Sequence, residues 1–166
     1  MHKRVVLVYD TCFLMDGASR NGLLPNLHYP VLYHVLPREV KVELSKHLSG
    51  DAQEKEKSAR AARSFVADII ATGRCEQPSL ENVEPIEPIE DLLGPDSETD
   101  RKLIAYAMQR SLDPDCSVLL ASLDGGIRVE VATRFSRKCP LRIYGEKLLR
   151  DALAPCGWMA GEPFPA

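Results

Sequence analysis

The stretch SVLLASLDGGIRVEVATRF, residues 117–135, contains a strand pattern followed directly by a helix pattern. SVLLASL is a short apolar run, which is typical of a strand buried on both faces of a sheet. After Asp124, apolar residues recur at helical spacing as far as Phe135. The alternation continues with a short strand, LRIYG (141–145), and a helix, EKLLRDAL (146–153). This order predicts a parallel sheet with helices on both faces.

The rest of the chain extends the same pattern toward the N-terminus. TDRKLIAYAMQRS (99–111) predicts a helix, and VVLVY (5–9) predicts a buried strand. Residues 32–36 indicate a second short strand, and residues 37–48 and 51–72 indicate two helices. The predicted fold class is α/β: a three-layer α/β/α sandwich around a central, mostly parallel sheet.

Length and composition limit the other possibilities. A chain of 166 residues favours one domain, 1–166, with a helical and proline-rich insertion at about 50–95. The 21 Lys and Arg residues against 24 Asp and Glu give a net charge of −3, which excludes a globally basic nucleic-acid coat protein. No apolar run approaches the ~18 residues of a membrane span. The five cysteines are scattered without CxxC spacing, so we expect a reduced, cytoplasmic protein.

Four acidic residues stand where a charge is costly, next to strands or apolar helix faces: Asp10, Glu43, Asp100 and Asp124. Asp10 follows VVLVY directly, while Asp100 and Asp124 each begin an apolar helix pattern. Taken singly, Asp10 is explained equally well as a helix or turn cap, and for Asp100 and Asp124 the cap is the favoured explanation. Glu43 lies on the same helix face as the apolar residues Val40 and Leu44. The alternative is that it lies at the edge of this apolar stripe and points sideways into water.

Taken together, the four acids favour a metal site. In a parallel sheet, ligands bind beyond the carboxyl ends of the strands, where these side chains would converge. Several carboxylates in one pocket cannot all ionise without compensating cations. Oxygen ligands select Mg²⁺ or Mn²⁺, which activates water and neutralises charge on a phosphodiester. P-loop and Rossmann nucleotide-binding motifs are absent from the sequence.

The order of these motifs resembles that of PIN-domain nucleases. The residues that carry the resemblance are VLVYDTCFL, PREVKVEL, TDRKLIAYA and LLASLDGGIRVEVA. By this resemblance, Asp10, Glu43, Asp100 and Asp124 are the catalytic, metal-binding acids, with Thr11 and Ser122 as supporting hydroxyl residues. Asp96 and Glu98 are additional acids that could contribute or substitute. Cys12 and Gly125–Gly126 depart from the residues usual in the family.

The resemblance also implies a function. PIN domains hydrolyse single-stranded RNA as metal-dependent endonucleases, many are toxins of toxin–antitoxin pairs, and many form homodimers. We therefore expect a Mg²⁺- or Mn²⁺-dependent ribonuclease, with single-stranded RNA and an antitoxin protein as partners. The alternative is a non-catalytic PIN-like scaffold or RNA-binding module.

Cations and histidines are the other side chains with candidate roles. Six cations are candidates for weak contacts to nucleic acid: Lys55, Lys57, Arg60, Arg63, Arg101 and Arg128. For those at 55–63, the alternative is an ordinary solvated helix face. The histidines His28, His34 and His47 have no metal-ligand spacing, so we expect them to be structural or surface residues.

Overall fold

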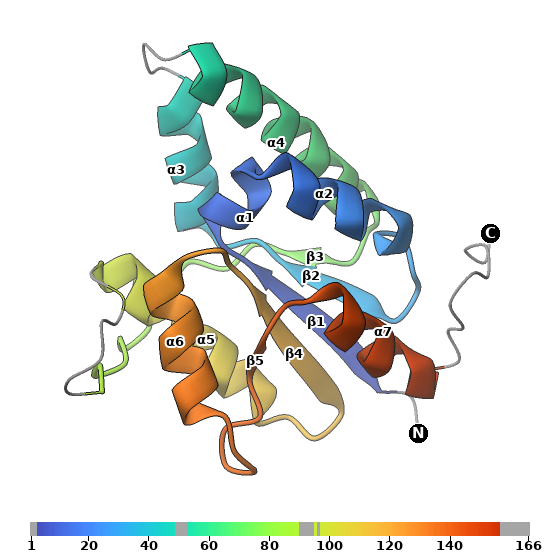
Figure 1. Ribbon diagram of the computed structural model, residues 1–166, viewed down its shortest axis with the longest axis vertical. Coiled ribbons are helices and arrows are strands. Elements are labelled where there is room, and N and C mark those ends of the chain that lie inside the picture. The colour runs from blue at the N-terminus through green and yellow to red at the C-terminus, as the bar shows by residue number, and fades with distance from the viewer. Residues whose placement is uncertain (1–2, 49–52, 90–94, 96, 157–166) are drawn as a thin grey trace.

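A computed structural model describes residues 3–48, 53–89, 95 and 97–156 (Figure 1). Its strands are β1 (Arg4–Tyr9), β2 (Leu32–Val35), β3 (Cys75–Glu76), β4 (Cys116–Ala121) and β5 (Arg142–Ile143). Its α-helices are α1 (Thr11–Met15), α2 (Gly17–Leu23), α3 (Arg38–Leu48), α4 (Gln53–Ala71), α5 (Glu98–Ser111), α6 (Gly125–Arg134) and α7 (Glu146–Leu153). Two 3₁₀ turns complete the described elements, η1 (Leu24–Asn26) and η2 (Ala154–Cys156).

The five strands form one sheet in the order β3-β2-β1-β4-β5, and every neighbouring pair is parallel. From β1 the chain continues to β2 and β3 on one side, whereas β4 and β5 lie on the other side. The gap beyond the ends of β1 and β4 is therefore the topological switch point, where open parallel sheets bind ligands. The α/β fold class with helices on both faces is confirmed.

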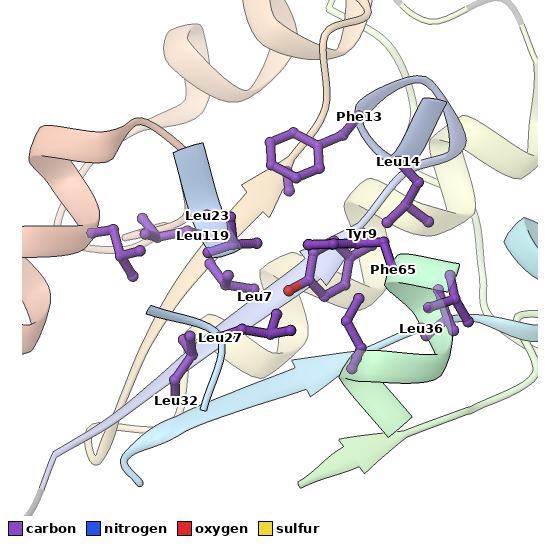
Figure 2. Packing of buried hydrophobic residues seen from close by; sticks show 14 of the residues in the cluster. Leu7, Tyr9, Phe13, Leu14, Leu23, Leu27, Leu32, Leu36, Phe65 and Leu119 are labelled. Atoms are coloured by element: carbon purple, nitrogen blue, oxygen red, sulfur yellow. The ribbon is translucent and has the colours of Figure 1, made fainter. Parts of the chain in front are cut away.

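Alternate residues of β1 supply two separate cores, as the pleat of a strand requires. Leu7 and Tyr9 pack with residues of α1, α2, α4 and α7. Figure 2 shows Phe13 of α1 and Phe65 of α4 in the same cluster as these two strand residues. Val8 faces the opposite way and packs with residues of α5 and α6. Figure 1 shows these two helices across the sheet from α1–α4. The two cores are the physical basis of the three layers.

The strands and longer helices match the sequence patterns to within one or two residues. The apolar side chains Phe65 and Ile69 of α4 are buried. The helix ends at Ala71, and Gly73, two residues later, takes a positive φ of 73°. The short helices α1 and α2 and the two-residue strand β3 carry little sequence signal. β3 pairs with β2 at His34↔Cys75, so its place depends on a neighbouring strand edge.

The proline-rich connection between β3 and α5 is held along the surface by side chains of α3, α5 and α6. Glu39 of α3 accepts the Leu80 backbone N–H at 2.7 Å, and Lys102 of α5 donates to the Glu81 carbonyl at 2.9 Å. The fully buried Glu130 of α6 accepts the backbone N–H of residue 89 at 3.2 Å. These bonds satisfy backbone groups that no strand partner reaches.

Within the described ranges, the helices are all too short or too polar to cross a lipid bilayer.

Candidate functional site

Asp10 lies at the carboxyl end of β1 and is nearly buried, with 7% of its surface exposed. Its carboxylate caps α1 by accepting the Thr11 backbone N–H at Oδ1, 2.8 Å away. Its Oδ2 accepts the Ser122 hydroxyl at 2.7 Å and the Cys12 thiol at 3.1 Å. The cap explanation for Asp10 is thus correct. It accounts for one oxygen only, because the second oxygen accepts from Cys12 in α1 and from Ser122 after β4.

Glu43 of α3 reaches the same edge of the sheet. Its neighbours Val40 and Leu44 are each 2% exposed, whereas Glu43 itself is exposed. It therefore lies at the border of the apolar stripe, as the solvent-facing alternative predicted. However, Thr11 Oγ1 donates to Glu43 Oε2 at 3.0 Å. Since Thr11 also donates its N–H to Asp10, this one residue links the two acids.

Ser122 and Asp124 follow β4 and complete the chain of contacts. The Ser122 hydroxyl, which donates to Asp10, accepts the Asp124 backbone N–H at 3.1 Å. Asp124 Oδ1 caps α6 by accepting the Ile127 N–H at 2.9 Å. Hydrogen bonds thus run from Glu43 through Thr11, Asp10 and Ser122 to the backbone of Asp124. Three of the four predicted acids are connected through both hydroxyl residues that the sequence singled out.

Asp100 approaches from the first turn of α5, where it is the third residue rather than the cap. The cap is Ser97, whose hydroxyl accepts the Asp100 N–H at 3.0 Å. Burial is the largest cause that raises the pKa of the Asp100 carboxyl to about 6, and the negative charges of Asp10, Asp124 and Glu43 add to it. All four carboxylates are therefore close enough to interact electrostatically.

Cys12 is the residue of this site whose role the sequence did not reveal. Its thiol donates to Asp10 and accepts the Leu123 backbone N–H at 3.2 Å. Burial and the adjacent Asp10 charge raise the pKa of the thiol to about 11. Cys12 is thus a neutral hydrogen-bonding side chain that ties the start of α1 to the loop after β4. The only sequence signal was its departure from the residues usual in PIN domains.

Within the described part of the chain, the four acids have no cationic partner in a salt bridge. Between residues that the structure describes, no salt bridge includes Asp10, Glu43, Asp100 or Asp124. A group of carboxylate oxygens without counter-charge has the donor chemistry that suits a hard divalent cation. As the side chains stand, no three acidic, imidazole or thiol groups of the described chain are gathered into a metal-holding arrangement. The types of donor thus fit such an ion, but their present spacing does not, so binding an ion requires the carboxylates to move closer together.

The remaining predicted acids lie away from this network or outside the structure. Asp96 is outside the described residues. Glu98, in the first turn of α5, is exposed and lies 3.9 Å from the Lys102 ammonium. An exposed pair of this kind contributes little to stability, and no hydrogen bond to the other acids is found for the Glu98 side chain in the described chain.

The predicted nucleic-acid contacts divide into two groups. Lys57, Arg60 and Arg63 are exposed along α4, and the side chain of Lys55 lies outside the described part of the chain. Arg101 is half-buried beside Asp100 in α5. Arg128 is exposed on α6, one turn after Asp124, and lines a hollow together with Ser122. Arg101 and Arg128 are therefore the members of this set that neighbour the acids in sequence.

Replacing Asp100 with asparagine is expected to stabilise the metal-free protein at pH 8 by about 1–2 kcal/mol. The folded protein holds a proton on Asp100 up to a pKa of about 6, whereas an unfolded aspartate loses it near 3.8. Stability from this group is therefore present below pH 4 and is lost as the pH rises through 6. The full shift corresponds to about 3 kcal/mol, which we reduce because the carboxyl is only partly buried.

Urea denaturation in EDTA at pH 4 and pH 8 measures this effect, with Glu98→Gln as the exposed control on the same helix turn. The Asp100→Asn variant should gain stability over the wild type at pH 8 and little at pH 4. An equal difference at both pH values would contradict the raised pKa of Asp100 in the folded protein.

Comparison of the chain with protein-family models and with curated proteins finds no match.

Proposed function

We propose that this protein is a PIN-like, metal-dependent endoribonuclease that hydrolyses phosphodiester bonds of single-stranded RNA. One observation carries the proposal: at the switch point of a parallel sheet, the Asp100 carboxyl is close enough to feel the charges of Asp10, Glu43 and Asp124, and none of the four forms a salt bridge with another described residue. Carboxylates that repel one another destabilise a fold unless a bound cation or a retained proton relieves the repulsion. Groups perturbed in this way cluster at functional sites. Their order along the chain, which resembles that of PIN-domain nucleases, supports the same assignment.

Asp10, Glu43, Asp100 and Asp124 would hold Mg²⁺ or Mn²⁺. When bound, such an ion supplies charge neutralisation at the phosphodiester and an activated water. The chain's own residues orient the ligands: Thr11 fixes one oxygen of Glu43, and Ser122 fixes one oxygen of Asp10. Because Asp124 and Asp10 each keep one oxygen on a helix N-terminus, their positions are set by the backbone.

The wider assignment is part of the same proposal. All five cysteines are free, which supports a reducing, cytoplasmic location. An antitoxin partner and a homodimer are further implications of the resemblance to PIN domains, and both depend on it alone.

A cleavage assay tests the proposed activity. End-labelled single-stranded RNA and a DNA strand of the same sequence are incubated with the protein in Mn²⁺, Mg²⁺ or EDTA. We expect metal-dependent cuts within the RNA and none in EDTA. Cutting of DNA alone would correct the substrate class. Binding of RNA with no metal-dependent cutting of either strand would contradict the enzyme and favour the non-catalytic RNA-binding alternative.

A further inference from the structure

Three hollows lie in series along the carboxyl edge of the sheet, and shared residues join them. The first, of about 550 Å³, lies between α3 and the start of α5; the second, of about 390 Å³, lies over α1; the third, of about 250 Å³, lies between α6 and α7. Glu43 lines both the first and the second hollow, and Leu123 lines both the second and the third. The three hollows therefore adjoin one another, and we call this series the track.

Of the four site acids, Glu43 is the one that lines the track in the described chain, where the first and central hollows meet. Thr11, Cys12 and Glu43 line the central hollow, and Asp10 is hydrogen-bonded to the first two of them. A phosphodiester that reacts at the acids would therefore lie in the central hollow, with the strand leaving it in both directions.

Each end of the track carries an exposed arginine. Arg38 lines the first hollow, and Arg128 lines the third. Within the described chain, neither guanidinium takes part in a salt bridge, in contrast to Arg110 and Arg134, which pair with glutamates at 2.6 and 2.8 Å. A guanidinium without a carboxylate partner has its donors available for phosphate.

Exposed apolar side chains lie between the arginines. Val42 in the first hollow is 55% exposed, and Leu123, at the border of the second and third hollows, is 43% exposed. Apolar side chains at such positions can contact the faces of unstacked bases, which only a single strand presents. A duplex would keep those faces covered.

We propose that this track binds one single-stranded RNA chain, with Arg38 and Arg128 contacting phosphates on opposite sides of the reacting phosphodiester. The proposal rests on the proposed function and adds the path of the substrate. It assigns RNA binding to these two arginines rather than to the exposed cations of α4. Because both arms of the strand are held, the protein acts on internal bonds and requires nucleotides on each side of the cut.

Fluorescence anisotropy with a labelled 12-nucleotide single-stranded RNA tests the track. All proteins are full-length, carry Asp100→Asn and are kept in EDTA, so that the RNA stays intact. We expect Arg38→Ala and Arg128→Ala each to weaken binding about 3- to 10-fold. Each should also reduce the slope of log affinity against log salt by about 0.7, the value for one phosphate contact on a single strand. The double variant Lys57→Ala/Arg63→Ala on α4 is the matched control and should change affinity less than 2-fold.

The result separates this inference from the proposed activity. Loss of binding in the two track variants supports the track even if the wild-type protein cuts no RNA. Conversely, unchanged affinity and salt slope in both variants would overturn the track even if the wild-type protein cuts RNA. A larger loss in the α4 control than in the track variants would also overturn it, because the RNA would then lie across α4.

Discussion

Replacing Asp10 with asparagine is expected to lower metal-dependent RNA cleavage on the order of 10³-fold, a loss similar to removal of a charge-stabilising group in other active sites. Asp10 is the acid at the centre of the hydrogen-bond network, with its oxygens bonded to Thr11, Cys12 and Ser122. Asparagine keeps the size of the side chain and one carbonyl oxygen for the Thr11 N–H. The substitution therefore removes a negative charge without opening a cavity.

Initial cleavage rates on labelled RNA at saturating Mn²⁺ measure the effect, and thermal unfolding in EDTA confirms that the variant folds. Glu98→Gln is the matched control, because it neutralises an exposed acid whose salt bridge in the described chain is with Lys102 of the same helix. The control should retain wild-type activity. A fully active Asp10→Asn protein would refute the proposed site, and an inactive Glu98→Gln protein would move the site toward the first turn of α5.

His34 is expected to make the protein sensitive to mild acid, with a loss of about 2 kcal/mol of stability between pH 7 and pH 5. Burial is the main cause that lowers the pKa of His34 to about 4, against 6.5 for an unfolded histidine. Its Nε2 lies 3.0 Å from the Leu27 carbonyl, so that Nδ1 is left to accept the Tyr9 hydroxyl at 2.7 Å. A protonated ring has no acceptor for Tyr9, and the neighbouring charged groups that act on it among the described residues are Arg74 and His28, which disfavour added positive charge.

The direction of this dependence follows from proton uptake in the two states. As the pH falls below 6.5, the unfolded chain binds a proton on His34 while the folded protein does not until about pH 4. The contribution of neutral His34 to the free energy of unfolding is therefore complete above pH 6.5 and is lost as the pH falls toward 4. The fall in the pKa of His34 from 6.5 to about 4 limits the total loss of stability to about 3 kcal/mol.

Urea denaturation of the wild type and of His34→Gln, at several pH values in EDTA, isolates the histidine. Glutamine provides a donor for Leu27 and an acceptor for Tyr9 but does not titrate in this range. Asp100 titrates in the same range with the opposite sign, and it does so in both proteins, so its effect cancels in the difference. If the two proteins lose stability in parallel from pH 7 to pH 5, the neutral state of His34 is not what the fold depends on.

The comparison between sequence and structure is clearest for the helix termini. The sequence allowed Asp10, Asp100 and Asp124 each to be a helix cap, and the structure shows that two of them are. At α5 the cap is Ser97, which leaves Asp100 in the first turn of the helix, close enough to the other acids for their charges to raise its pKa. The N-cap is the residue at which the chain enters the helix, and the packing of α5 on the sheet decides which residue that is.

By itself, the sequence determined the α/β class, the order of the longer strands along the chain and which four acids interact at the end of the sheet. It did so because buried strands and amphipathic helices have different apolar periods, and because a charge next to an apolar run stands out. Only the tertiary structure decided that β3 exists, that Thr11 joins Glu43 to Asp10, and that Cys12 contacts both Asp10 and the loop after β4. These contacts join residues far apart in the chain. Their geometry depends on the pairing of β1 with β2 and β4, and no local pattern encodes it.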